Sequence, residues 1–199
     1  MPSLQQLNDR LFVVVNELAK ETGWLHGAAV AFTSYGVVLF ALGLLAGVFC
    51  ARRGTPRTLA AAVWAGLGTL VAVAVNQPIG NAIGEQRPYI AHPDALLLVQ
   101  RTTDFAFPSD HAVMAGAVAM GLFTVSRKWG TVAAVAAVAL AASRVYVGAH
   151  YPGDVVVGLA VGALVSWVGW LAVGPLLTRV ASSLCGSRLR PLPASTRSS

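Results

Sequence analysis

A small set of polar side chains in the middle of the sequence could together bind and cleave a phosphate ester. They fall in three short stretches between apolar segments: Arg87-Pro88, Pro108-Ser109-Asp110-His111, and Ser143-Arg144 followed by His150 and Asp154. The planar fork of an arginine binds phosphate oxygens through two hydrogen bonds. Of two histidines, one can attack phosphorus while the other protonates the leaving oxygen. The carboxylate of Asp154, four residues after His150, can hold an attacking imidazole in the right tautomer.

The second stretch also has the pattern of a helix start. Pro108 and Ser109 stand before a long apolar run, with Ser109 or Asp110 as the N-cap, and the free amides at such a start attract anions. Each stretch alone has a simpler interpretation: Arg-Pro occurs by chance, Pro-Ser-Asp-His can be a helix cap only, and a single His150 can be an interfacial histidine. A metal site is the next alternative, but the histidines lack the His/carboxylate spacing of a zinc site. We therefore predict neither a metal nor a cofactor.

The composition places this chemistry in a membrane. Of the 199 residues, 56% are hydrophobic and only 11% are charged, whereas about 25% are charged in an average soluble domain. The mean hydropathy is +0.67. Such a chain cannot cover the surface of a soluble domain, and it is too hydrophobic to be disordered. We therefore predict an all-α, polytopic helical bundle in a bilayer.

Five apolar segments are candidate membrane spans, because roughly 20 residues of helix cross about 30 Å of hydrocarbon. They cover residues 27–50, 58–75, 111–126, 129–142 and 155–177. Residues 4–20 combine apolar side chains at helical spacing with polar ones, which is typical of an amphipathic helix in the membrane interface. The predicted organisation has three parts: an interfacial helix in residues 1–24, a transmembrane domain in residues 25–178 with outer loops 76–111 and 143–154, and a basic, disordered cytosolic tail in residues 179–199.

The basic residues indicate topology rather than a nucleic-acid partner, although the net charge is +6. A nucleic-acid binder needs a basic patch or stripe interleaved with aromatic residues. Here the basic residues cluster instead between spans, at 52–57 and 127–128, and in the tail. This distribution follows the positive-inside rule and puts both outer loops on the outside. Cys50 and Cys185 then lie on the cytosolic side, where we expect no disulfide.

Together the three stretches resemble the motifs of the type 2 phosphatidic acid phosphatase family, which are K-x6-R-P, P-S-G-H and S-R-x5-H-x3-D. The third motif matches in full from Ser143 to Asp154. The second matches with Asp110 in place of glycine, and the first keeps Arg87-Pro88 but has Gly80 at the lysine position. The resemblance covers residues 76–154 by motif, and the number of spans agrees with it elsewhere. These features look most like the bacterial branch that acts on undecaprenyl diphosphate.

The resemblance implies a metal-free mechanism through a phosphohistidine. In it, His150 resembles the nucleophile, Asp154 its orienting partner, and His111 the general acid that later activates water. The residues that resemble the phosphate-binding set are Arg87, Ser109 and Arg144.

Two departures from the motifs affect the phosphate site. Asp110, which we place in that site, adds a negative charge there unless it caps the helix or pairs with Arg101 or Arg144. Gly80 leaves open how the first motif helps to hold the phosphate, since it has no side chain.

These observations predict a multi-pass lipid phosphatase of the bacterial plasma membrane with its site on the extracytoplasmic face. The expected substrate is a polyprenyl diphosphate of the undecaprenyl type, cleaved to the monophosphate as in cell wall biogenesis. An alternative is a phosphatase of phosphatidic acid or phosphatidylglycerol phosphate. An alternative from another class is a small transporter or lipid-binding membrane protein without catalysis. The vanadium haloperoxidases share the motifs, but they are soluble, and this composition argues against them.

Overall fold

The computed structural model describes residues 3–188, with side chains through Leu184. The described chain is helical and contains no strand. Its elements are α1 (Leu4–Glu21), a short 3-10 turn η1 (Gly23–Leu25), α2 (His26–Ala51), α3 (Pro56–Ile83), the single-turn α4 (Pro88–Ala91), α5 (Asp110–Val125), α6 (Arg127–Tyr146) and α7 (Pro152–Arg188). The predicted all-α fold, with five apolar helices after an amphipathic one, is confirmed.

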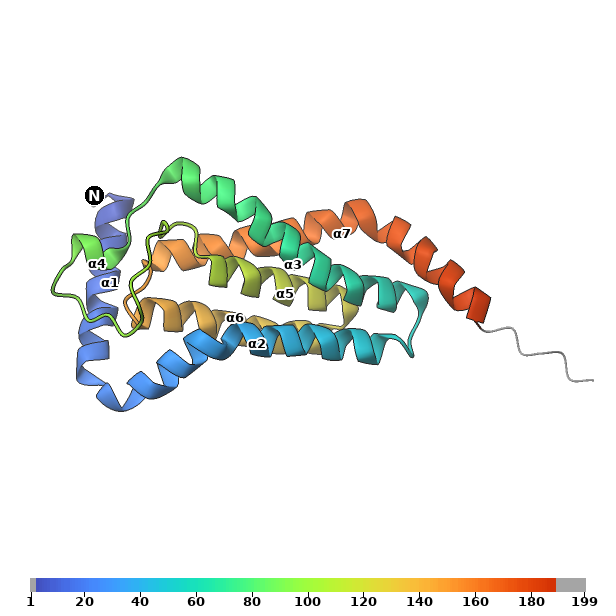
Figure 1. The fold of residues 1–199 in the computed structure, drawn as a ribbon, viewed down its shortest axis with the longest axis horizontal. Helices are drawn as coiled ribbons and strands as arrows, with labels where there is room; N and C mark the ends of the chain where they lie inside the picture. The colour runs from blue at the N-terminus through green and yellow to red at the C-terminus, as the bar shows by residue number, and fades with distance from the viewer. Residues whose placement is uncertain (1–2, 189–199) are drawn as a thin grey trace, which may run out of the picture.

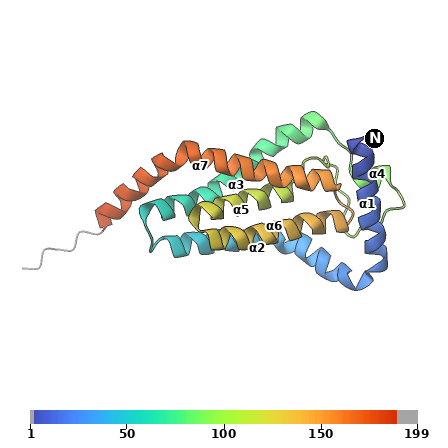
Figure 2. The same ribbon diagram turned by 180° about the vertical axis from the view of Figure 1, so that it is seen from behind.

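The five apolar helices form one elongated bundle. Helices α2, α3, α5, α6 and α7 run along its length, and α5 lies among the others (Figure 1). Helix α1 lies across one end, next to α4 and the long loop that follows it, as the view from behind also shows (Figure 2). The connections from α2 to α3 and from α5 to α6 lie at the opposite end.

Four segments of the described chain are long and apolar enough to cross a membrane. They are Gly23–Ala51, Pro56–Ala91, Arg127–Tyr146 and Pro152–Leu184, while α5 is a shorter apolar helix. Its 16 residues extend about 24 Å, somewhat less than the hydrocarbon thickness. Helix α5 is also enclosed by its neighbours, because Ala115, Val118, Ala119 and Leu122 belong to the largest buried cluster. The protein is thus a multi-pass membrane protein whose shortest apolar helix is covered by the others.

Glycines allow α5 and α7 to pack backbone against backbone. A Cβ at Gly162 of α7 would overlap the carbonyl of Val113, and one at Gly116 of α5 would overlap the carbonyl of Leu159. Such small residues permit close approach where the bilayer supplies no hydrophobic driving force. The beginnings of the two helices meet as a result, and the Ser109 amide donates to the Asp154 carbonyl at 3.2 Å. The second and third sequence motifs are therefore joined by the main chain.

The two largest differences between predicted and observed boundaries lie at the ends of α3 and α7. The second span does not end at residue 75, because α3 continues to Ile83 and ends at Gly84, whose φ of 65° suits glycine. The tail is not disordered from residue 179, because α7 continues to Arg188. The hydroxyls of Ser182 and Ser183 there donate to carbonyls one turn earlier, so these polar residues do not end the helix. The remainder of the predicted tail, 189–199, and the side chain of Cys185 lie outside what the structure describes.

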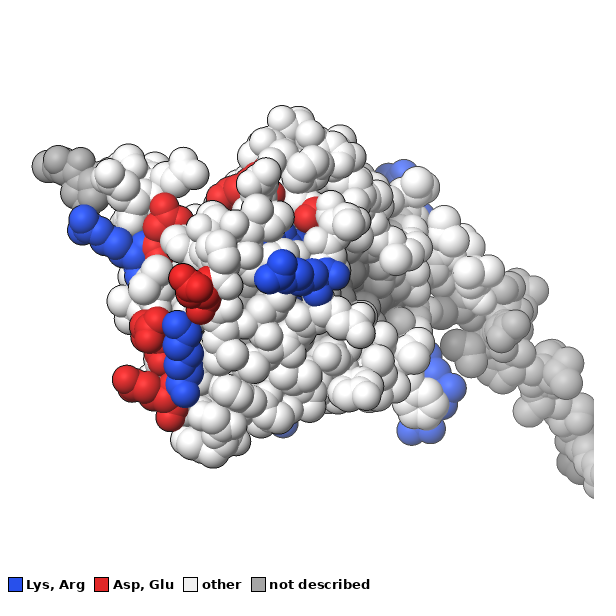
Figure 3. Space-filling model, turned by 60° about the vertical axis from the view of Figure 1, so that its left-hand side comes forward, with Lys and Arg blue, Asp and Glu red and all other residues white. Residues whose placement is uncertain are grey.

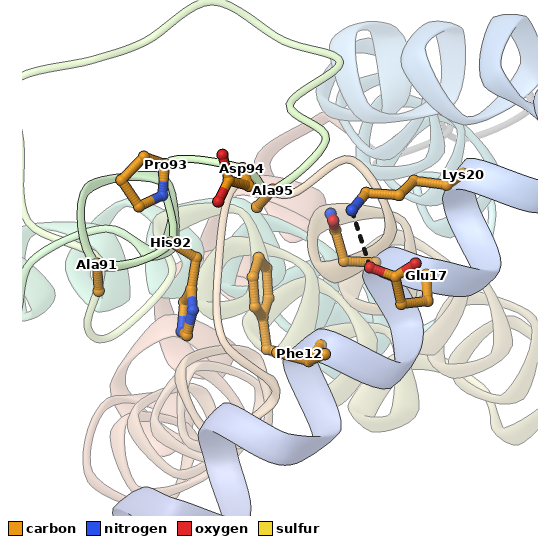
Figure 4. A pocket seen from close by; sticks show the side chains of 10 residues that line it. Phe12, Glu17, Lys20, Ala91, His92, Pro93, Asp94 and Ala95 are labelled. Atoms are coloured by element: carbon orange, nitrogen blue, oxygen red, sulfur yellow. Dashed lines mark hydrogen bonds and ion pairs between the residues drawn. The ribbon is translucent and has the colours of Figure 1, made fainter.

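Helix α1 is fastened to the loops at its end of the bundle. Phe12 is fully buried and lies against His92, with ring centroids 5.5 Å apart (Figure 4). The Asn16 side chain makes two hydrogen bonds to the main chain of Leu96, and Asn8 accepts one from the Gly153 amide at 2.7 Å. A cleft of about 260 Å³ remains between α1 and residues 91–95, beside the Lys20–Glu17 ion pair. The position of α1 in a membrane interface stays a prediction.

The charges divide the two ends of the bundle. The basic clusters at 52–57 and 127–128 lie in or directly beside the α2–α3 and α5–α6 connections, at the end away from α1. Carboxylates gather on the end that carries α1 (Figure 3). The positive-inside rule predicts that the loops between α3 and α5 and between α6 and α7 share the extracytoplasmic side; this orientation stays a prediction.

We expect single cysteines, placed in a background without Cys50 and Cys185, to report this orientation in whole cells. Thr55→Cys and Ser126→Cys should react with a membrane-impermeant maleimide only after the membrane is opened. Asp94→Cys, exposed in the α4–α5 loop, should react in intact cells. Labelling of positions 55 and 94 from the same side would contradict the topology.

Candidate active site

His150 lies in the tight turn between α6 and α7 and is 2% exposed. Gly148 makes the turn possible, because its φ of 79° favours glycine and a Cβ there would overlap the Leu96 carbonyl. The ring lies between two hydrogen-bond partners: Nδ1 is 2.8 Å from the Ala106 carbonyl oxygen, and Nε2 is 2.9 Å from Nη1 of Arg87. A guanidinium only donates, so Nε2 accepts and Nδ1 carries the proton. The lone pair therefore points to Arg87.

Asp154 lies near this imidazole but is not its main partner. Its Oδ2 is 3.5 Å from Nδ1 of His150, longer than the bond to Ala106. The same oxygen accepts the Tyr151 amide at 2.8 Å, which fastens the first turn of α7. The predicted orienting role of Asp154 stays a prediction, and the Ala106 carbonyl, which carries no signal in a sequence, holds the tautomer.

Arg87 lies in the short segment between α3 and α4, directly before α4, and its guanidinium is buried. Besides His150, its Nη1 contacts the Ala149 carbonyl at 3.0 Å. Its Nη2 forms an ion pair with Asp104 at 2.8 Å. The sequence motifs do not contain Asp104, so sequence reasoning missed it. Its spacing from Arg87 carries no recognisable pattern.

Arg144 and Ser109 complete a buried donor set around the imidazole. Both residues are buried, yet Nε of Arg144 and Oγ of Ser109 have no hydrogen-bond partner within the described residues. Ser109 is the N-cap of α5, but its side chain makes no cap hydrogen bond. Buried donors are rarely left unpaired, and a bound anion would pair both.

His111 follows directly in the first turn of α5 and is partly exposed. The close α5–α7 packing brings this turn to the start of α7, so the two predicted histidines lie in one site. Its predicted role as general acid stays a prediction.

Asp110 is placed differently from what we predicted. It neither caps α5 through its side chain nor pairs with Arg101 or Arg144. Its carboxylate accepts from Nδ2 of Asn76 at 2.7 Å and from Nε2 of Gln77 at 3.1 Å. Both amides belong to the two turns of α3 that the sequence assigned to a loop. The negative charge is thus held on the α3 side, where it also favours the helix start.

The charges around His150 keep its imidazole neutral. Burial lowers its pKa well below the ordinary value, and the positive charges of Arg87 and Arg144 lower it further. A neutral ring with its proton on Nδ1 has an unprotonated Nε2 near pH 7, and the lone pair of that nitrogen accepts from Nη1 of Arg87. This is the state that a nucleophile needs.

The carboxyl of Asp104 stays charged because two nearby groups outweigh the effect of burial on its pKa. Burial alone would raise its pKa, but a hydrogen bond from the Thr102 side chain and the charge of Arg87 hold the pKa below its ordinary value. The described residues contain no group of three or more His, Cys, Asp or Glu that could hold a metal ion. The absence of a metal remains a prediction.

Fold and site together define a polytopic helical membrane protein with a buried, anion-seeking centre at one end. Residues 61–177 match the model of the PAP2 superfamily, and the chain belongs to that family. It is 30% identical over 171 residues to the bacitracin transport permease protein BcrC of Bacillus licheniformis, covering 85% of this chain and 83% of the relative. It is 29% identical over 162 residues to the undecaprenyl-diphosphatase BcrC of Bacillus subtilis, covering 81% and 82%.

A solved structure supports the same fold. The transmembrane PAP2-type phosphatidylglycerolphosphate phosphatase of Bacillus subtilis has a TM-score of 0.66 at 22% identity, with 84% of this chain and 85% of that chain covered. The family match and the curated relatives, together with this fold, show a membrane lipid phosphatase of the PAP2 type. The non-catalytic transporter alternative is set aside.

The hydrogen bond from His150 to Ala106 predicts a moderate effect of Asp154→Asn. The tautomer should persist, so kcat should fall about tenfold to a hundredfold, rather than the roughly ten-thousandfold seen where an aspartate alone sets the tautomer. Steady-state kinetics and the thermal midpoint should be measured together. A ten-thousandfold loss at an unchanged midpoint would show that Asp154, not the Ala106 carbonyl, orients the ring.

Proposed function

We propose that this protein hydrolyses a polyprenyl diphosphate of the undecaprenyl type to the monophosphate through a phosphohistidine on His150. The observation that carries the proposal is the state of that ring. It is buried, neutral and protonated on Nδ1, with Nε2 directed at Arg87. The unpaired donors of Ser109 and Arg144 lie in the same site.

In the first step, Nε2 of His150 attacks the terminal phosphorus and the bond to the bridging oxygen breaks. His111 gives its proton to that oxygen, and the lipid leaves as the monophosphate. In the second step, His111 takes a proton from water, whose oxygen attacks phosphorus and breaks the P–N bond. Inorganic phosphate leaves and His150 is free again. The arginines and the Ser109 hydroxyl stabilise the charge of the five-coordinate phosphorus in both steps.

The substrate assignment is supported by similarity and by chemistry. The Bacillus subtilis relative is named as an undecaprenyl-diphosphatase, and the similarity covers most of both chains. A phosphate is a better leaving group than an alkoxide, so a diphosphate needs less electrostatic assistance. That requirement agrees with Gly80 at the position where relatives of the family keep lysine. We further propose that the site faces the extracytoplasmic side, since the basic clusters lie at the other end.

We expect variants of His150 and His111 to give different amounts of trapped phosphoenzyme with a labelled substrate. His150→Ala should form no acid-labile phosphoenzyme, because the attacking nitrogen is gone. His111→Ala should still accumulate some, at a rate lower by about 10²–10⁴-fold, the usual contribution of a general acid. His26→Ala, a histidine of α2 bonded to the Ala19 carbonyl, is the matched control and should behave as the wild type. Labelled phosphate bound covalently to the His150→Ala variant would overturn the assignment of His150 as the nucleophile.

We expect the substrate preference to appear in phosphate release from a panel of lipids in EDTA. Undecaprenyl diphosphate should be hydrolysed faster than phosphatidic acid or phosphatidylglycerol phosphate at equal surface concentration. Gly80→Lys should narrow the difference if monophosphates need the lysine; a Cβ at this position approaches the Phe107 carbonyl to 3.3 Å, so the loop must shift slightly. Equal rates on all lipids would remove the substrate assignment but leave the assignment as a phosphatase in place.

The same assay tests the metal-free mechanism. A complete loss of activity in EDTA that a divalent ion restores would refute that mechanism.

A further inference from the structure

The segment around Arg87 and the loop before α5 run antiparallel to each other in a fixed register. The Ala106 amide donates to the Glu85 carbonyl at 2.8 Å. Two residues further along, Arg87 pairs with Asp104. Two residues beyond that, the Tyr89 hydroxyl bonds to both the carbonyl and the amide of Thr102, at 2.9 and 3.1 Å.

This register holds Asp104 opposite Arg87, because the two segments are attached to each other on both sides of the ion pair. The bonds at Glu85 and at Tyr89 fix the loop on either side of the ion pair. The guanidinium of Arg101 lies over the Tyr89 ring, 5.5 Å from its centroid, and adds to the second attachment. Asp104 therefore keeps its place even though its side chain is 58% exposed. An exposed ion pair without such support would contribute little.

Two acceptors hold the outer edge of the Arg87 guanidinium. Asp104 takes Nη2 at 2.8 Å through its carboxylate, and its carbonyl takes Nε at 3.4 Å. The Ala149 carbonyl takes one proton of Nη1. With these positions filled, the second proton of Nη1 points to Nε2 of His150 and the second proton of Nη2 is free. The Nη1 contact is thus directed at the nitrogen that would attack phosphorus in the proposed function.

We propose that Asp104 is the positioning residue of the phosphate-binding arginine. It acts through Arg87: its carboxylate fixes the plane of the guanidinium, so that the free edge meets the oxygens of a phosphoryl group that His150 attacks. The inference rests on the proposed function. The other carboxylates near the site have different contacts: Asp110 accepts from Asn76 and Gln77, and Oδ2 of Asp154 accepts the Tyr151 amide.

The carboxylate has a second consequence for the resting site. Nη1 of Arg87 donates to the lone pair of His150, so a phosphoryl group that His150 attacks must take over that proton. Asp104 keeps the guanidinium in place during this exchange, because its own contact is on the opposite edge. Removing it frees the arginine to remain on His150 or to turn into solvent.

A double-mutant cycle on the full-length protein tests the coupling with undecaprenyl diphosphate as substrate. Asp104→Ala should lower kcat/KM about tenfold, the range of one charge-assisted hydrogen bond. It should weaken inhibition by vanadate, a mimic of five-coordinate phosphorus, by a similar factor. In an Arg87→Ala background the same change should alter kcat/KM less than twofold, because the group that Asp104 positions is absent. Equal losses in both backgrounds would overturn the proposal.

Three controls separate positioning from folding and from charge. Asp94→Ala removes a carboxylate from the same loop at an exposed site and should leave kcat/KM unchanged. The exchange Thr103→Asp with Asp104→Thr keeps composition and net charge but moves the carboxylate out of register, and it should lose as much as Asp104→Ala. Asp104→Asn retains an oxygen acceptor and should recover part of the loss.

The outcomes distinguish this proposal from the proposed function. Wild-type kinetics in the exchange variant would show that only the charge of the loop matters, which would overturn positioning. A wild-type protein that releases no phosphate from undecaprenyl diphosphate but cleaves another lipid would remove the substrate assignment, and the cycle would be run on that lipid. An Arg87→Ala variant with full activity would remove the phosphate site itself.

Discussion

Two guanidinium groups lie buried beside a neutral imidazole, and this concentration of positive charge is the constraint on which the rest of the site depends. Burying charge is costly unless it is paired. Arg87 is paired by Asp104, whereas Arg144 keeps an unpaired Nε and Ser109 an unpaired Oγ. Burial lowers the pKa of His150, and the same charges lower it further, so the arrangement that favours an anion also keeps this imidazole unprotonated. In the proposed mechanism, an arriving phosphoryl group satisfies both arginines at once, and the attacking nitrogen needs no activation by a base.

The bundle makes this concentration possible by bringing three loops to one end. Close packing of α5 on α7, permitted by Gly116 and Gly162, joins the start of both helices, so Ser109 and His150 lie in one layer. Helix α1 closes the same end through Phe12 and through Asn8, which accepts the Gly153 amide at the first turn of α7. An amphipathic helix far away in sequence thus helps to hold the turn that carries His150. The apolar residues of α1 therefore stabilise the protein itself, in addition to forming a surface that can contact a membrane.

The sequence was sufficient to predict the class of fold, because apolar length is a local pattern. Its motif spacing also named residues that the structure brings to one end of the bundle, and their catalytic roles remain proposals. It could not predict partners that act through the main chain. The Ala106 carbonyl sets the tautomer of His150, and any residue type supplies a carbonyl. Asp104 was missed for a related reason: its pairing with Arg87 follows from the antiparallel register of two loops, which no motif encodes. For Asp110 the sequence suggested a place in the phosphate site, a helix cap or a pair with Arg101 or Arg144, yet two neutral amides bind it.

The second predicted span was ended too early, at residue 75, and this explains why the partners of Asp110 were missed. Polar residues from Asn76 onward suggested that the helix had left the membrane, so the amides of Asn76 and Gln77 were assigned to a loop with no defined direction. In the structure α3 continues for two more turns, and these side chains face the start of α5. Asn76 is buried and also binds the Pro108 carbonyl at 3.0 Å, directly before Ser109. A polar stretch at the end of an apolar helix therefore has two physical meanings, exit into water or entry into a polar site. Only a partner such as Asp110, whose charge must be compensated near an anion site, distinguishes them.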